Sequence, residues 1–324
     1  MSATTSGAPV RTTTGAPLGT TTNGAPLGVR RPAGRRRRRT YVRRYWMFAM
    51  PAALVVAAVI VFPWLFTLVM SVYDWKVSGN VYYVGLANYA HLLRDDRFLW
   101  AVARTLYFTT AAVVLPVVIG LWAAVCFARK FRLRGAARTA FILPMMATPV
   151  AIALVWTMMF HPQLGVLNYL LTLVGLPPSS WVYSSDTVIP TLVMVETWQW
   201  TPLVMLIVLG GISSLPVDPY EAAVIDGASG WQMFRFITVP LIWPFIVVAT
   251  VMRIIDALKA FDTIFVITNG GPGTSSETIN MLLYQTAFGY YDLGYASAMV
   301  VVFFVLIMLL SLVLLRTRQQ DLTL

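Results

Sequence analysis

The sequence predicts an all-α, polytopic membrane protein with six transmembrane helices. Hydrophobic residues make up 58% of the chain and charged residues only 11%, and the mean hydropathy is +0.72. This composition excludes an ordinary soluble domain. Six apolar runs are each long enough to cross the ~30 Å hydrocarbon core at about 1.5 Å per residue. Arginines crowd the segment before the first run and the loop between the second and third, which the positive-inside rule assigns to the cytoplasm.

The chain begins with a low-complexity tail, residues 1–34, in which a Thr-, Gly- and Pro-containing pattern nearly repeats at 12–19 and 21–28. Such residues bury too little apolar area to offset the entropy of ordering, so the tail is expected to be disordered. A basic juxtamembrane collar, residues 35–45, follows and is expected to hold the N-terminus in the cytoplasm. The apolar run after it is too long for a signal peptide, and no small-residue cleavage site follows.

The membrane domain is expected to cover residues 46–318, followed by a C-terminal tail of residues 319–324. Its first helix is expected to kink at Pro63. The loop before the fourth span lacks basic residues and is expected outside, with a short surface helix at 165–174. Both termini are then cytoplasmic. The expected spans are residues 46–72, 101–128, 139–160, 187–213, 241–268 and 291–315.

A polar stretch, residues 216–244, lies between the fourth and fifth spans, and we call it the knuckle. Asp218 is expected to be the N-cap of a short helix, with Pro219 at the first helical position. Gly227 is expected to break this helix, because a residue without Cβ accepts positive φ. A second short helix is expected to stop at Pro240. The result is a compact cytoplasmic protrusion, a shape that suits contact with another protein.

The knuckle resembles the EAA loop of ABC-importer permeases, and its fuller pattern resembles the carbohydrate, or maltose-type, branch. The matching residues are Glu221, Ala222, Ala223, Asp226, Gly227, Phe234, Ile237 and Pro240. A second match lies downstream, in the Asn269–Gly273 run and in the Gly294–Ala298 run. With the six spans, the resemblance covers roughly residues 45–318.

This resemblance implies a type I ABC-importer permease fold, with a cytoplasmic coupling helix between the fourth and fifth spans. It implies a transport subunit in a bacterial cell membrane that forms half of the path for a sugar, with trehalose or maltose the first expectation. The implied partners are a second, homologous permease, two ATPase subunits, an extracytoplasmic solute-binding protein and membrane lipids. ATP and Mg would bind to the ATPase, and no cofactor or metal to this chain.

No sequence motif gives this chain an ATPase site or other catalytic site. It has no phosphate loop, no zinc-binding His pair and no serine-nucleophile elbow. Cys126 is the only cysteine, which excludes an intrachain disulfide. The net charge of +11 is explained by basic residues that set the membrane topology and contact anionic lipid headgroups. No nucleic-acid partner is therefore expected.

Within the knuckle, Glu221 has two compatible roles: a capping glutamate that reaches back to the Asp218 backbone, and an ion-pair partner for the ATPase. Ala222 and Ala223 allow close approach of a partner surface. The knuckle aromatics have two alternatives of equal weight, which are anchoring in the ATPase cleft or packing back under the helices. These aromatics are Trp231, Phe234 and Phe236.

The fifth expected span contains charges at successive steps of three, namely Arg253, Asp256, Lys259 and Asp262. Charges at membrane depth cost about 2.5–3.5 kcal/mol each on insertion scales, so they should face the protein interior or a wet cavity. They form either an internal ion-pair ladder or a polar wall of the translocation path. The ladder is slightly favoured for Arg253, and the path for the other three.

The fourth span contributes aromatic and polar side chains of the kind that bind sugars, whose hydroxyls need hydrogen bonds and whose C–H faces stack on rings. The tryptophans could instead form an interfacial belt. The residues expected along the substrate path are Glu196, Trp198, Gln199, Trp200, Asp256, Lys259, Asp262, Asn280 and Tyr284.

Two other functions compete with sugar import. The first is an ion-gradient-driven secondary transporter or channel that uses the fifth-span charges as a relay, but the internal repeats typical of that class are not seen. The second is an intramembrane enzyme, for which no catalytic constellation exists.

The Gly270–Gly273 run is expected to be an external turn, either near the solute-binding protein or a plain loop tip.

Overall fold

The computed structural model describes residues 48–77 and 79–321, with side chains up to residue 309. The expected tail (1–34), the collar (35–45) and the last residues (322–324) lie outside the described residues. The chain divides into two units, Met1–Val59 and Ile60–Leu324. The described residues are mostly helical, as the sequence predicts.

The first apolar helix is described from Phe48 to Met70, so it ends two residues before the expected end at residue 72. It contains a π-helical turn, η1 (Ala57–Val61), directly before α2 (Phe62–Met70). Pro63 lies in the first turn of α2. Because proline has no N–H and its ring crowds the preceding turn, the wider turn accommodates it. A π-helical turn thus lies directly before Pro63, and the kink expected there stays a prediction.

A short antiparallel pair, β1 (Tyr73–Asp74) and β2 (Tyr82–Tyr83), follows α2, and α3 (Ala87–Leu92) comes next. The second span, α4 (Asp96–Ala128), begins five residues before its expected start. Asp95 explains the earlier start, since its carboxylate accepts hydrogen bonds from the backbone N–H groups of Arg97 (2.9 Å) and Phe98 (3.4 Å).

The third expected span, residues 139–160, is not one straight helix but part of a bent pair. The chain forms α5 (Arg134–Met146) and α6 (Pro149–Met159), which are bent by 97° relative to each other. Thr148 is extended, as a residue before proline prefers to be, and its hydroxyl accepts from the Ala151 N–H at 3.4 Å. The Thr-Pro pair therefore ends one helix and starts another.

The next two helices match their expected positions. The surface helix is α7 (Val166–Leu173), followed by a 3-10 turn η2 (Trp181–Tyr183), and the fourth span is α8 (Val188–Ser213). Asn168 ties α7 to the following segment, because its amide donates to Ser179 O at 3.1 Å and accepts from Trp181 Nε1 at 2.7 Å.

The knuckle forms α9 (Asp218–Ile225), α10 (Gly230–Met233) and a π-helical turn η3 (Phe234–Thr238) that continues into α11 (Val239–Leu258). The prediction that Pro240 ends the second helix was wrong, since Gly230–Leu258 is one helix of 29 residues. The widened turn before Pro240 lets the Val239 N–H bond to Phe234 O, so the helix passes the proline.

The prediction for the fifth span, residues 241–268, was also wrong at its outer end. The helix stops at Leu258, and α12 (Asp262–Thr268) begins after a short break. The expected external segment that follows contains α13 (Ile279–Tyr284) and a π-helical turn η4 (Gln285–Gly289). The last helix, α14 (Leu293–Asp321), begins two residues inside the expected sixth span and runs past its end.

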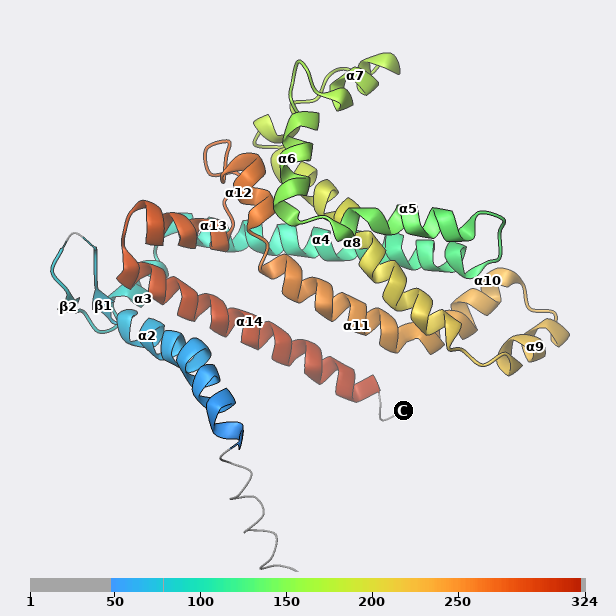
Figure 1. The fold of residues 1–324 in the computed structure, drawn as a ribbon, viewed down its shortest axis with the longest axis horizontal. Coiled ribbons are helices and arrows are strands. Elements are labelled where there is room, and N and C mark those ends of the chain that lie inside the picture. The colour runs from blue at the N-terminus through green and yellow to red at the C-terminus, as the bar shows by residue number, and fades with distance from the viewer. Residues whose placement is uncertain (1–47, 78, 322–324) are drawn as a thin grey trace, which may run out of the picture. The chain divides into compact units, whose positions relative to one another are not determined.

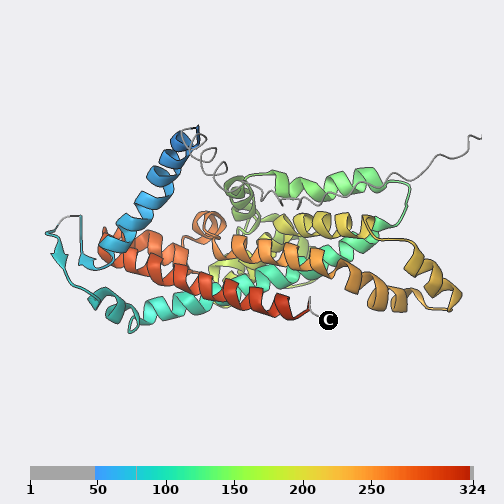
Figure 2. The ribbon, with the colours of Figure 1, turned by 90° about the horizontal axis from the view of Figure 1, so that it is seen from below.

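The core lies where α8 and α11 run alongside α4 (Figures 1 and 2). Near the knuckle, the buried side chains of Val204, Met205 and Ile242 form one apolar cluster with small residues of α4. Gly120 permits this approach, because a Cβ there would lie 2.8 Å from the Val204 side chain. Separately, α14 packs against α2 and α3.

Four helices among the described residues are long and apolar enough to cross a membrane, or five if the bent pair α5–α6 counts as one span. They are Phe48–Met70, Asp96–Ala128, Val188–Ser213 and Gly230–Leu258. Within Ile60–Leu324, the α4–α5 connection and the knuckle lie at the same end of these helices, and β1, β2 and α3 lie at the other end (Figure 1). This agrees with the expectation that both connections face the same side of the membrane.

Adjacent glycines in α8 provide a matched test of this packing. A Cβ at Gly211 would lie 2.5 Å from the Phe245 ring, whereas a Cβ at Gly210 would meet nothing within 4 Å. Gly211→Ala is therefore expected to destabilise the protein by roughly 1–3 kcal/mol through overpacking. Gly210→Ala should be neutral or stabilising by up to about 1 kcal/mol, since alanine is the better helix former. Thermal unfolding in detergent would compare them, and equal midpoints would contradict the α8–α11 contact.

Candidate coupling surface and substrate path

The first turn of α9 is not capped by the residue that the sequence predicts. Val217 occupies the N-cap, Asp218 is the first helical residue, and no side chain caps this helix among the described residues. The expected Asp218 cap was therefore wrong. Glu221 lies on the exposed surface of the first turn, and its expected bond to the Asp218 backbone is not formed. Its carboxylate faces solvent, where it stabilises the positive end of the helix dipole and can contact another molecule.

The end of α9 matches the prediction for Gly227. Its φ is +76°, a conformation that a side chain with Cβ rarely adopts. Two hydrogen bonds close the helix: Gly227 N–H to Val224 O at 3.1 Å, and Ala228 N–H to Ala223 O at 2.9 Å. This pair of bonds is a Schellman motif, which reverses the chain sharply after α9.

The start of α10 is fixed by a capping box that the sequence analysis missed. The Ser229 hydroxyl accepts from the Gln232 N–H at 3.3 Å, and the Gln232 side chain accepts from the Ser229 N–H at 2.7 Å. The signal was readable, because a serine followed three positions later by glutamine is a typical helix start.

The knuckle presents an exposed surface with both charge and apolar area. Glu221, Ala222 and Asp226 are exposed, as are Ile225 (86%) and Pro240, whereas Ala223 is buried. Its acidic residues outnumber its single arginine, so a basic partner surface would complement it.

The aromatic residues of the knuckle divide between the two expected alternatives. Trp231 and Phe236 are 69% and 72% exposed, and are available to a partner. Phe234 is half-buried and its ring packs 5.5 Å from that of Trp231. Ile237 is also half-buried. Phe234 and Ile237 therefore contribute to the inner side of the knuckle.

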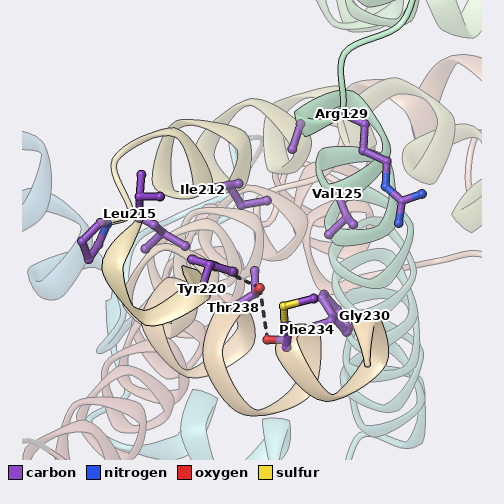
Figure 3. A pocket seen from close by; sticks show the side chains of 12 residues that line it. Val125, Arg129, Ile212, Leu215, Tyr220, Gly230, Phe234 and Thr238 are labelled. Atoms are coloured by element: carbon purple, nitrogen blue, oxygen red, sulfur yellow. Dashed lines mark hydrogen bonds between the residues drawn. The ribbon is translucent and has the colours of Figure 1, made fainter. Parts of the chain in front are cut away.

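An apolar pocket of about 460 Å³ lies beneath the knuckle, between the C-terminal ends of α4 and α8 and the helices α9 and α10 (Figure 3). Its walls include Val125, Leu215 and Phe234, with Arg129 also lining it. The Tyr220 hydroxyl is hydrogen-bonded to the Thr238 hydroxyl at 2.9 Å, which joins α9 to the start of the long helix. The two halves of the knuckle are thus linked to each other.

A second, polar pocket of about 250 Å³ lies at the other end of the long helix. It collects five of the nine expected path residues. Its lining residues are Pro149, Glu196, Trp200, Asp256, Lys259, Ala260, Phe261, Asp262 and Thr263. Carboxylates, an ammonium group and an indole ring around a small cavity can bind a polyhydroxylated molecule by hydrogen bonds and ring stacking.

The expected ion-pair ladder is not formed as a single row. Arg253 pairs with Glu196 of α8 at 3.2 Å instead of with Asp256. Asp256 and Lys259 form a partly exposed pair at 3.8 Å. Asp262 starts a separate helix, so it does not continue the row along α11.

Four other expected path residues lie elsewhere. Trp198 lines a separate apolar cavity of about 560 Å³ between α4, α5 and α8. Gln199 is fully buried, and its amide has no hydrogen-bond partner among the described residues. Asn280 donates to Leu258 O at 2.8 Å, and so holds the end of α11. Tyr284 packs between aromatic rings, which belong to Phe261, Phe265 and Phe288.

A polar network that the sequence did not reveal joins α4 to the segment before α13. Arg97 forms a forked pair with Glu277, with Nη2 to Oε1 at 2.6 Å and Nε to Oε2 at 2.8 Å. Arg97 also donates to Gln285 Oε1 at 2.7 Å and to the Tyr290 hydroxyl at 3.0 Å. Glu277 is almost fully buried.

Within the described residues, no cluster of His, Cys, Asp and Glu could hold a metal ion.

Comparison with known proteins assigns the chain to a family. Residues 117–321 match the family model described as the inner membrane component of binding-protein-dependent transport systems. The chain belongs to this family. A probable ABC transporter permease of Sinorhizobium fredii is 34% identical over 282 residues, covering 86% of this chain and 91% of the relative.

Two further comparisons agree with this family. The trehalose/maltose transport system permease MalF of Thermococcus litoralis is 33% identical over 275 residues, covering 84% of this chain and 92% of that protein. A chain in the crystal structure of a bacterial alginate ABC transporter, in complex with an alginate-bound periplasmic protein, has a TM-score of 0.73. It is 22% identical and covers 85% of this chain and 94% of that chain, so the likeness supports the fold.

Proposed function

We propose that this inner membrane component is a permease subunit of an ATP-driven sugar importer. It forms half of the translocation path and contacts a cytoplasmic ATPase through the knuckle. The observation that carries this proposal is the single helix Gly230–Leu258. At one end this helix bears the exposed Trp231, and at the other the Asp256 carboxylate of the polar pocket. A contact at the knuckle is thus connected to the pocket by one continuous element.

Sugar is the proposed substrate class, with trehalose or maltose first. Support comes from the trehalose/maltose permease among the relatives and from the chemistry of the polar pocket. Asp256 and Asp262 can accept hydrogen bonds from hydroxyl groups, and Trp200 can stack on a sugar face. An apolar substrate would leave the carboxylates unused.

The proposed topology has six transmembrane spans and both termini in the cytoplasm, in a bacterial inner membrane. The bent pair α5–α6 is the third span in this scheme, and α14 is the sixth. The proposed partners are a homologous permease, two ATPase subunits that bind ATP and Mg, a solute-binding protein and membrane lipids. This chain then has no ATPase activity of its own and contributes coupling and a path.

The alternative of an ion-gradient-driven transporter or channel depends on a row of charges along the fifth span. The observed pairing weakens this alternative, because Arg253 is neutralised by Glu196 and the helix ends before Asp262. Import by the reconstituted complex distinguishes the two functions. The importer requires ATP and the solute-binding protein, whereas the alternative requires an ion gradient and operates with this chain alone.

Removing a carboxylate from the polar pocket tests its proposed role in sugar binding. Asp256→Asn or Asp262→Asn is expected to raise the KM of ATP-driven sugar uptake about 10-fold or more. A charged hydrogen bond contributes roughly 1.5–3 kcal/mol, and 1.4 kcal/mol is tenfold. Asp186→Asn, an exposed acid before α8, is the matched control. Unchanged KM values in both pocket variants would exclude this cavity from the sugar path.

A further inference from the structure

The helix that begins in the knuckle reaches the polar pocket without a break. Gly230–Leu258 has 29 residues, which corresponds to about 42 Å at 1.5 Å per residue. The Ser229 cap anchors one end. The Asn280 amide holds the other, through Leu258 O at 2.8 Å and Ala260 O at 3.3 Å. This helix therefore provides a continuous connection from the knuckle to the polar pocket.

Arg253 connects this helix directly to two others and, through Glu196, to a third. Its side chain is fully buried, and Nη2 lies 3.2 Å from both the Glu196 carboxylate of α8 and the Ala112 carbonyl oxygen of α4. Its guanidinium carbon lies 5.2 Å from the centre of the Trp200 ring. Glu196 in turn accepts from the Thr263 hydroxyl of α12 at 3.4 Å.

The partners of Arg253 are also walls of the pocket. Glu196, Trp200 and Thr263 all line the polar pocket, and all belong to this one cluster. One guanidinium nitrogen, Nη2, donates to both the Glu196 carboxylate and Ala112 O, and these charge-assisted hydrogen bonds fix the position of α11 relative to α8 and α4 more strictly than apolar contacts between helices do. Any shift of α11 along or around its axis therefore carries Glu196 and Trp200 with it, or breaks the pair.

We propose that Arg253, held by Glu196, is the positioning residue that converts movement of the knuckle into a change in the polar pocket. This inference rests on the proposed function as a sugar importer. The pair is then a mechanical link between the ATPase-facing end of the helix and the substrate side, in addition to a packing contact. Its loss should separate ATP hydrolysis from sugar import while the subunits still assemble.

The test replaces the buried pair by two apolar side chains of similar volume, in Glu196→Met/Arg253→Met. Replacing a buried ion pair as a whole is often neutral or stabilising, whereas removing one partner leaves a buried charge and is strongly destabilising. The double variant therefore removes the directional link and retains the packing. The complex is reconstituted with ATPase and solute-binding protein, and the ATP hydrolysed per sugar imported is measured at saturating sugar.

We expect the double variant to assemble with the ATPase, and to hydrolyse at least 10-fold more ATP per imported sugar than the natural sequence. The maximal import rate should fall, whereas a lost sugar contact would mainly raise KM and be overcome at saturating sugar. Lys76→Met/Asp292→Met removes a more exposed pair outside the long helix and should leave the ratio unchanged. The proposal is overturned if the double variant hydrolyses as much ATP per imported sugar as the natural sequence does.

If the double variant fails to assemble, Arg253→Lys decides the question. Lysine keeps the charge beside Glu196 but has a shorter side chain without the planar guanidinium, so it does not reproduce the combined contact with Glu196, Ala112 O and the Trp200 ring. If Arg253→Lys raises the amount of ATP hydrolysed per imported sugar, the proposed role of the Arg253–Glu196 pair is supported. If that amount equals the one measured for the natural sequence, the proposal is overturned. Failure of the proposed function would look different, because the natural complex itself would then import without ATP or import no sugar.

Discussion

Glu221→Lys in the knuckle is expected to release the ATPase from the complex and to reduce ATP-driven uptake about 100-fold. Glu221 is exposed and makes no capping bond, so the substitution should leave α9 folded. It places a positive charge on a surface whose acids complement a basic partner. Placing like charges opposite each other in an interface costs several kcal/mol, and about 2.8 kcal/mol corresponds to 100-fold.

The measurement is co-purification of the ATPase with the tagged permease, together with uptake into proteoliposomes. Asp186→Lys makes the same charge change on an exposed acid at the opposite end of α8, and should retain the ATPase. If Glu221→Lys keeps a full complement of ATPase and natural uptake, the knuckle is not the docking surface proposed above.

Arg97→Met is expected to lower the free energy of unfolding by roughly 2–4 kcal/mol. Breaking a buried ion pair by removing one partner costs about 3–5 kcal/mol, and the remaining exposure of Arg97 reduces that cost. The variant leaves the buried Glu277 carboxylate without its forked partner, at 1% side-chain exposure. It also releases Gln285 and Tyr290, which Arg97 holds against α4.

Thermal unfolding of the purified complex measures this effect. Lys76→Met is the control, because Lys76 is exposed and its oxygen partner on Asp292 lies at 3.8 Å. An exposed pair contributes at most about 1 kcal/mol, so the control should unfold near the natural midpoint. Equal midpoints for Arg97→Met and Lys76→Met would mean that the Arg97–Glu277 network contributes little to stability.

The long apolar helices were readable from sequence, because the length of an apolar run is a local property. Residues 187–213 and the observed α8 (Val188–Ser213) differ by one residue at the start. The bend between α5 and α6 was also readable, since Thr148-Pro149 lies in the middle of the expected span. The error at Pro240 arose because a proline inside a helix can be accommodated by a π-helical turn before it instead of ending the helix.

The break after Leu258 could not be read locally. No glycine or proline lies between Leu258 and Asp262, and the helix end is held by Asn280, which is distant in sequence. The same limit applies to Arg97 and Glu277, which are 180 positions apart. The Glu196–Arg253 pair could have been predicted from the sequence, because two opposite charges in apolar spans are expected to neutralise each other.

The most direct test of the central claim places one cysteine on the knuckle. With Cys126→Ser removing the single natural thiol, Ile225→Cys puts a reactive group at a position that is 86% exposed. We expect a membrane-impermeant reagent to label this cysteine only from the cytoplasmic side, and a short crosslinker to join it to the ATPase. Labelling only from the outer side, or labelling without any crosslink to the ATPase, would contradict the account.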